Sequence, residues 1–324
     1  MNMTMKAFFA TFCTALALYT ALPAQQTPLF SLYRDQWGVL NPAALSNNYL
    51  LNNRTMSLSG AWHVQWWGLP QSPRTQTLAW EMVEEQRNSV FGAHIMNDQT
   101  GAIGQTGAYG RYAYRIKMGG RRTSQSLLIG LNAGIVQYRA NLNEIDFPDP
   151  ATAPTESARS IRPDLGVGVF YHYSDRYYAG ISVPQAFGFR SSFPDAESTF
   201  SIRRVPHLYG VAGGYWSTPW LGNETSFVEP SVWIKYVPNN PLNIDLNLRA
   251  QVSELVWVGT GANLGFGVLP TIALHFETGL FFSEQVQLLN SQCKIGFAFD
   301  LPVTQSVSRA FGSSAEVMVV YSWR

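Results

Sequence analysis

A two-residue alternation of apolar and polar positions is the dominant pattern in this sequence. Between residues 243 and 252, for example, apolar residues take every even position and polar residues every odd position. Successive side chains of an extended backbone point to opposite faces, so such a run is typical of a β-strand with one apolar and one polar face. Roughly 300 residues, at about 20 per strand and connection, predict about 14 such strands. The predicted strands cover residues 54–67, 74–84, 88–98, 105–118, 124–138, 163–174, 177–186, 204–216, 226–237, 242–252, 254–264, 270–282, 286–299 and 314–324.

The alternation alone is compatible with a large soluble β-sandwich as well as with a barrel in a membrane. Three features favour the membrane. Many runs extend over roughly 9–13 residues, the length that crosses a bilayer at a tilt. The chain also ends in a strand, residues 314–324, with aromatic and β-branched residues on one face. Aromatic residues gather near the ends of runs, as in the interfacial girdles of a barrel; they are Trp66, Trp67, Tyr177, Tyr178, Trp216 and Trp220.

A sheet in hydrocarbon has to close on itself. Every backbone N–H and C=O group there needs a partner inside the protein, and an open sheet would leave two unpaired edges. The sequence therefore predicts an all-β fold, a closed antiparallel transmembrane β-barrel of about 14 strands over residues 54–324. We expect the long connections 139–162 and 187–203, rich in Pro, Ser and charge, to be exposed loops.

Composition narrows the class of protein further. Charged residues make up 13% of the 324-residue chain and aromatic residues 14%, which excludes intrinsic disorder. The mean hydropathy of −0.05 is too low for a bundle of membrane helices. The 22 Lys and Arg residues nearly equal the 21 Asp and Glu residues, so the net charge gives no reason to expect nucleic acid as a partner.

The N-terminus has the features of a targeting signal. Lys6 precedes an apolar stretch that ends in small residues, which predicts a cleaved signal peptide over residues 1–24 and export of the rest. Cleavage would remove Cys13 and leave Cys293 as a single cysteine, so no internal disulfide is expected. Residues 25–53 are Asn-rich and irregular, and we expect them either to fold into the lumen or to lie on the periplasmic side.

No pattern in the chain indicates a catalytic, cofactor or metal site. The five His residues do not lie in a cluster with metal-ligand spacing, although His275 and Glu277 share a strand face. Gly259, Gly261 and Gly265 form a GxGxxxG run without a following helix, and we expect them to make room for large interior neighbours. The sequence therefore predicts no enzyme, while an outer-membrane hydrolase with a nucleophile assembled across strands stays an open alternative.

Charged residues of both signs fall on the predicted inner face. In a narrow barrel they would form ion pairs that plug the lumen, and in a wide barrel they would line an unselective pore; the sequence leaves both open. The predicted lumen-facing residues are Glu81, Arg111, Arg115, Lys117, Glu229, Lys235, Asp245, Arg249, His275 and Glu277.

Short motifs in a fixed order carry a family resemblance across nearly the whole mature chain. They are Gln25–Phe30, Asn41-Pro42-Ala43, Gln65-Trp66, Pro73-Arg74-Thr75-Gln76, Asn97-Asp98, Tyr112–Arg115, Gly180–Gln185, Pro230-Ser231 with Lys235, Pro241 with Asp245, Trp257 with Gly259, and Phe299-Asp300-Leu301-Pro302. In this order they resemble the PorP/SprF family of Bacteroidetes outer-membrane proteins. The chain departs from that family near its C-terminus, where Ala315-Glu316 stands in place of the usual His-Glu.

The resemblance implies a non-enzymatic outer-membrane barrel of the type IX secretion and gliding apparatus. Such a barrel would dock, help to export or anchor secreted cargo or adhesins. Its periplasmic partners would be a peptidoglycan-binding lipoprotein and the secretion ring. The alternative is a passive or substrate-specific transport barrel.

From the shared motifs we hypothesise that Asn41-Pro42-Ala43 and Pro73-Arg74-Thr75-Gln76 fix the N-terminal segment against the barrel. Arg74 would donate hydrogen bonds to backbone carbonyls or a carboxylate.

Overall fold

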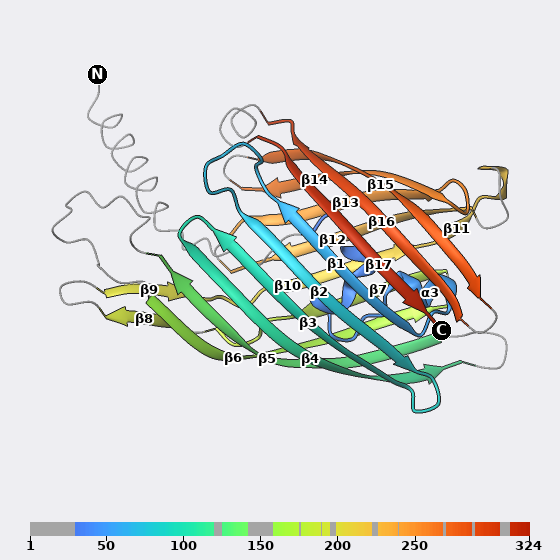
Figure 1. Cartoon of the computed structure of the whole chain (residues 1–324), viewed down its shortest axis with the longest axis horizontal. Helices are drawn as coiled ribbons and strands as arrows, with labels where there is room; N and C mark the ends of the chain where they lie inside the picture. The colour runs from blue at the N-terminus through green and yellow to red at the C-terminus, as the bar shows by residue number, and fades with distance from the viewer. Residues whose placement is uncertain are drawn as a thin grey trace, which may run out of the picture.

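The computed structural model describes residues 30–119, 125–141, 158–174, 176–188, 190–194, 199–221, 226–238, 240–267, 270–286, 289–304 and 312–324. The predicted signal peptide lies outside the described residues. Fourteen strands form one closed antiparallel ring, as predicted (Figure 1). The ring closes where the first strand pairs with the last, from Met56 opposite Trp323 to Val64 opposite Ala315. The ring strands are β1 (Met56–Val64), β2 (Arg74–Glu84), β3 (Ser89–Thr100), β4 (Ile103–Met118), β5 (Gln125–Ala140), β6 (Ala158–Tyr173), β7 (Tyr177–Val183), β10 (Leu208–Gly214), β12 (Phe227–Tyr236), β13 (Leu242–Gln251), β14 (Val256–Phe266), β15 (Thr271–Val286), β16 (Leu289–Pro302) and β17 (Ser314–Trp323).

Three short strands lie outside this ring, and the sequence did not predict them. β11 (Trp216–Ser217) extends the edge of β12, while β8 (Arg190–Pro194) and β9 (Thr199–Arg203) pair only with each other. The connection predicted over 187–203 therefore contains the hairpin of β8 and β9, which the alternation did not indicate. Runs of five residues interrupted by Pro and charge are too short for alternation to be recognised.

The two faces of the ring differ as the alternation predicts. On β13, Leu246 and Leu248 are each 47% exposed, whereas Asn247 is 8% and Arg249 3% exposed. Leucines exposed in this way on a sheet face belong to the surface that lipid covers. Two residues of the predicted aromatic girdle depart from it: Tyr178 is buried inside the barrel, and Trp66 lines a cavity at one end of the lumen. Adjacent residues in a strand face opposite sides, so Tyr177 and Tyr178 cannot both reach lipid.

The two rims of the barrel have unequal connections. At the rim where β1 ends lie the connections 65–73, 141–157, 184–207 and 303–313; we call it the loop end. The opposite rim, where β17 ends, carries mostly short turns such as 85–88, 174–176 and 252–255; we call it the turn end.

Residues 30–53 fold inside the barrel, and we call them the plug. They form the 3-10 turn η1 (Tyr33–Asp35) and the short helices α2 (Trp37–Leu40) and α3 (Asn47–Asn52), enclosed by the strands in Figure 1. Plug side chains make up much of the hydrophobic core: Trp37 contacts Phe170 and Tyr178, and Tyr33 lies between Trp37 and Trp233. Within the described residues, none of the helices is both long and apolar enough to span a bilayer.

Candidate functional site

The plug runs through the lumen from the loop end to the turn end. Its first residues bond to Asp300 and Glu316, near the loop-end tips of β16 and β17. Its last helix contacts Arg115 and Glu85 at the turn end. The plug thus fills the lumen along its length, held by contacts at four levels.

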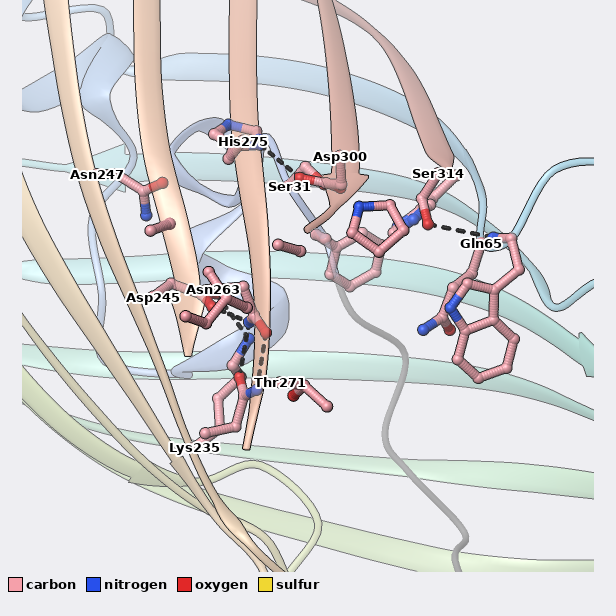
Figure 2. A pocket seen from close by; sticks show the side chains of 18 of the residues that line it. Ser31, Gln65, Lys235, Asp245, Asn247, Asn263, Thr271, His275, Asp300 and Ser314 are labelled. Carbon is pink, nitrogen blue, oxygen red and sulfur yellow. Dashed lines mark hydrogen bonds and ion pairs between the residues drawn. The ribbon is translucent and has the colours of Figure 1, made fainter. Parts of the chain in front are cut away.

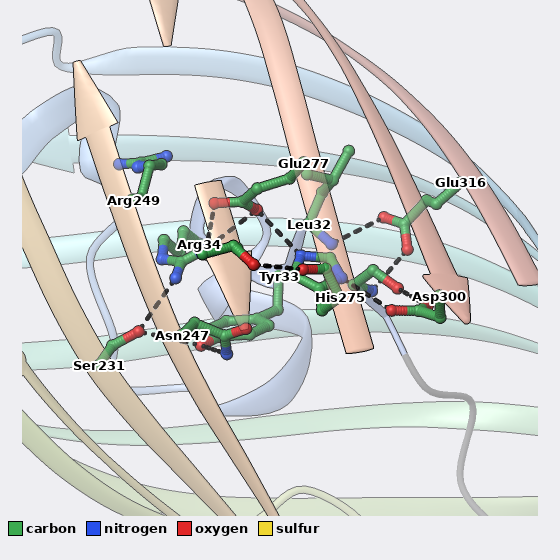
Figure 3. A network of polar contacts seen from close by, with 12 residues as sticks. Leu32, Tyr33, Arg34, Ser231, Asn247, Arg249, His275, Glu277, Asp300 and Glu316 are labelled. Atoms are coloured by element: carbon green, nitrogen blue, oxygen red, sulfur yellow. Dashed lines mark hydrogen bonds and ion pairs between the residues drawn. The ribbon is translucent and has the colours of Figure 1, made fainter. Parts of the chain in front are cut away.

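The first level fixes the backbone of the plug with carboxylates. Glu316 accepts hydrogen bonds from the backbone N–H groups of Ser31, at 2.6 Å, and Leu32, at 3.2 Å (Figure 3). The Ser31 hydroxyl donates to Asp300 Oδ2 at 2.7 Å, and His275 Nδ1 lies 2.7 Å from Asp300 Oδ1. Hydrogen bonds to an ionised carboxylate are stronger than neutral ones, so this cluster anchors the start of the plug.

Arg34 forms the second level as a buried cation shared between strands. Its Nη1 donates to both oxygens of Glu277, at 3.0 and 3.1 Å, and its Nη2 donates to Ser231 Oγ at 3.0 Å (Figure 3). Glu229 lies 3.4 Å from Arg34 Nε and 2.8 Å from Arg249 Nη2. Burial lowers the pKa of Arg34, but its acidic neighbours, Glu277 most strongly, together outweigh burial, so the pKa stands well above its ordinary value. Arg34 is therefore charged, and removing it would leave the buried carboxylates of Glu277 and Glu229 without this neutralising cation.

The third level seats Asn41-Pro42-Ala43 on wall positions occupied by glycine. Asn41 Nδ2 donates to the backbone oxygen of Val169 at 3.1 Å. A Cβ atom at Gly130 would come within 2.5 Å of the Ala43 nitrogen, and one at Gly168 would overlap the Asn41 carboxamide oxygen. These glycines leave space for a close approach of plug and wall.

Next to this seat, Arg111 and Glu81 clamp the plug from the wall. Arg111 Nη1 donates to the backbone oxygens of Ala44, at 2.8 Å, and Pro42, at 3.3 Å, while its Nη2 pairs with Glu81. Glu81 Oε1 accepts the hydroxyl of Ser46 at 2.7 Å. A wall cation thus satisfies plug carbonyls while a wall anion satisfies a plug hydroxyl.

The fourth level closes the turn end. Tyr49 OH accepts from Arg115 Nη1 at 2.5 Å and donates to Glu85 Oε1 at 3.2 Å. Burial raises the pKa of the Tyr49 phenol, which keeps the proton that it donates. Tyr215 OH donates to Asn47 Oδ1 at 2.7 Å, so the first half of the last plug helix is tied to the wall at both Asn47 and Tyr49.

A cavity of 370 Å³ remains between the plug and the wall at the loop end (Figure 2); we call it the mouth cavity. Phe30 and Ser31 of the plug line one side, and strands β12 to β15 line the other. Lys235 Nζ donates to Asp245 Oδ2 at 2.6 Å, while Asn243 and Asn263 exchange hydrogen bonds of 2.9 and 2.8 Å.

The predicted lumen residues occupy the barrel interior, apart from Lys117. Lys117 shares the inward parity but is exposed where β4 ends. The others take part in the plug and wall contacts described above or are buried beside them; they are Glu81, Arg111, Arg115, Glu229, Lys235, Asp245, Arg249, His275 and Glu277.

The second predicted motif does not hold the plug as hypothesised. Arg74 is exposed at the start of β2, and within the described residues no hydrogen bond or ion pair joins it to the plug. The alternation explains this, because Thr75 faces inward and so Arg74 and Gln76 face outward. Thr75 Oγ1 donates to Asp98 Oδ1 at 2.6 Å, a bond between wall strands. Pro73 precedes β2, and its oxygen accepts from the Gln65 backbone nitrogen at 2.9 Å.

Several other motif residues lie around the mouth cavity. Gln65, Trp66 and Asp300 all line it. Sequence reasoning missed Arg34, Ser46 and Glu316 as plug contacts. A signal for Arg34 existed: Arg34 and Asp35 are the only charged residues in the irregular segment 25–53.

Within the described part of the chain, no group of three or more His, Cys, Asp or Glu side chains is placed to hold a metal ion. Gly259 and Gly261 of the GxGxxxG run give room to the side chains of Glu277 and Asn247, as expected.

Comparison with known proteins identifies a family. The family model for "Type IX secretion system membrane protein PorP/SprF" matches residues 22–321. No curated protein matches the sequence significantly.

Among solved structures, the CymD monoaromatic hydrocarbon channel is similar with a TM-score of 0.47 and 9% identity, over 91% of this chain and 98% of that one. A Pseudomonas aeruginosa FadL homologue is similar with a TM-score of 0.41 and 10% identity, over 83% of this chain and 88% of that one. BamA from Haemophilus ducreyi lacking POTRA domains 1-3 is similar with a TM-score of 0.40 and 10% identity, over 84% of this chain and 70% of that one.

Proposed function

Because this chain belongs to the PorP/SprF family of type IX secretion system membrane proteins, we propose that it is a plugged outer-membrane barrel that docks secreted polypeptides. It helps to export or anchor particular cargo or adhesins and does not catalyse a reaction. Its loop end faces outward, since long connections of such barrels are extracellular and short turns periplasmic. Cargo or adhesin meets the loop end. The peptidoglycan-binding lipoprotein and ring components meet the turn end.

The observation that carries this proposal is the filled lumen. Plug residues such as Trp37, Arg34 and Leu45 are almost entirely buried, and charged wall residues bond to the plug instead of lining water. A transport barrel would need a passage, and here opening one would require breaking several buried charge-assisted contacts. The filled lumen therefore supports docking over passive or substrate-specific transport.

Affinity purification of the full chain from native envelopes tests the proposal. Secretion-system components and at least one secreted protein should co-purify, and deletion of the gene should remove that protein from the cell surface or medium. A tagged unrelated outer-membrane barrel from the same cells is the control. Co-purification of lipid and abundant porins alone, together with an unchanged set of secreted proteins after deletion, would refute the docking role.

A further inference from the structure

The mouth cavity contains polar groups that the closure of the lumen does not use. It lies at the loop end, above the first residues of the plug, and includes Gln65, Trp66 and Asp300 from the sequence motifs (Figure 2). Its volume of 370 Å³ falls within the usual range for small-ligand pockets, roughly 300–1,000 Å³. It is large enough for a few residues of an extended chain but not for a folded domain.

The charges of the mouth cavity are already neutralised within it. Lys235 pairs with Asp245 at 2.6 Å, and His275 pairs with Asp300 at 2.7 Å. His63 lies 3.6 Å from Glu316. A charged ligand would therefore find no unpaired opposite charge among the described lining residues, and its desolvation would go uncompensated.

The amide side chains retain capacity for hydrogen bonds. A primary amide has two donor hydrogens and two acceptor lone pairs. Asn247 Nδ2 donates to Tyr33 OH at 3.0 Å, but its Oδ1 accepts nothing from the described residues, although the residue is 8% exposed. The Gln65 side chain has no hydrogen bond to the described residues. Each peptide group offers the donor and the acceptor that such amides need.

Apolar surface lies beside these amides. Phe30 and Trp66 line the cavity, and Trp66 has a φ of 57°, a left-handed conformation that is unusual for a bulky residue. The Trp66 backbone nitrogen is held in place by Ser314 Oγ at 3.1 Å. Strained backbone of this kind is concentrated at binding and catalytic sites.

We propose that the mouth cavity binds a short, uncharged, extended segment of a secreted polypeptide, whose peptide groups pair with Gln65 and Asn247 while an apolar side chain packs on Trp66. The inference rests on the proposed docking function and adds the chemistry of the segment that is recognised. A polypeptide is favoured over a neutral glycan because the family serves protein secretion and because amide side chains match peptide groups in both donor and acceptor.

Binding of defined peptides to the purified mature chain in detergent tests the inference. The probe is a pool of hexapeptides, capped at both ends and built from Gly, Ala, Leu, Ser, Thr, Asn and Gln; retained members are identified by mass spectrometry and titrated by calorimetry. Saturable binding is expected, weakened roughly tenfold by Gln65→Ala and by Asn247→Leu, since loss of one hydrogen bond is worth about a factor of ten. Gln99→Ala, an exposed amide at the end of β3, is the matched control and should change nothing. Versions of a retained peptide with Glu or Lys at its centre should bind at least tenfold more weakly.

Three results would overturn the inference. They are retention of no peptide, tighter binding of maltohexaose with competition against the peptide, and equal affinity of the Gln65→Ala and unmodified proteins. Gln65 is partly exposed, so its variant should fold even if Asn247→Leu does not. Native co-purification with the unmodified chain separates the two proposals. If secretion components co-purify with it while it binds no peptide, only the cavity inference fails; if they do not co-purify with it, the docking function itself fails.

Discussion

Replacing Arg111 with Met should release the middle of the plug. Arg111 donates to the backbone oxygens of Pro42 and Ala44 and neutralises Glu81, so Arg111→Met removes two charge-assisted hydrogen bonds and leaves a buried carboxylate without its cation. Removing one partner of a buried ion pair costs about 3–5 kcal/mol. That cost is borne by the docked plug, because once the plug is released water can reach Glu81.

Hydrogen exchange of plug amides measures the loss directly. Val39, Asn41 and Ala44 donate to backbone oxygens within the plug and are enclosed by the barrel, so they exchange only when the plug opens. A cost of about 3–5 kcal/mol corresponds to about 160- to 5,000-fold faster exchange. Amides in the ladder between β1 and β2 should be unchanged and serve as the internal control.

A second substitution separates charge from packing. Glu81→Gln in the Arg111→Met background removes the unpaired charge while its carbonyl can still accept from Ser46. Plug amides of the double variant should therefore exchange more slowly than those of Arg111→Met alone. The reasoning is refuted if Arg111→Met leaves plug exchange within about threefold of the unmodified protein, or if the double variant exchanges as fast as the single one.

Two further predictions test the wall and the lipid face. Gly168→Ala places a Cβ against the Asn41 carboxamide and should weaken plug docking by about 1–3 kcal/mol, the usual cost of overpacking. The loss is again measured as faster hydrogen exchange of the plug amides. Gly110→Ala is the control and should have no effect, since a Cβ there would have nothing within 4 Å. Leu246→Arg puts a charge on the lipid face of β13 and should lower the free energy of unfolding from lipid vesicles by about 2–4 kcal/mol. Leu255→Arg, in an exposed turn outside the strands, should cost much less, and equal losses for the two arginines would contradict a lipid face at Leu246.

The strands were predictable because lipid on the outside and polar groups on the inside require apolar and polar residues to alternate along each strand. Residues 74–84 were predicted as a strand and form β2 with the same bounds, and the prediction over 242–252 differs from β13 by one residue. The need to pair every backbone group in hydrocarbon then requires closure of the sheet. Neither step depends on contacts distant in the sequence.

The path of the plug was not predictable in the same way. Ser31 and Glu316 are 285 residues apart and meet only because β1 closes on β17. Parity placed Glu277 and Glu229 on the inner face but could not select their partner, since Arg34 reaches both carboxylates from a segment without periodicity. Arg74 shows a different limit. The motif that contains Arg74 was recognisable in the sequence, but whether its side chain faces the lumen or the outside is decided by its odd or even position along β2.

Ion current through the unmodified mature chain in a planar bilayer most directly tests whether the plug closes the lumen. We expect a silent barrel, whereas a protein carrying both Arg111→Met and Asn41→Ala should show intermittent openings, which verifies that inserted barrels are detected. A steady open-channel current from the unmodified chain would contradict a lumen filled by residues 30–53.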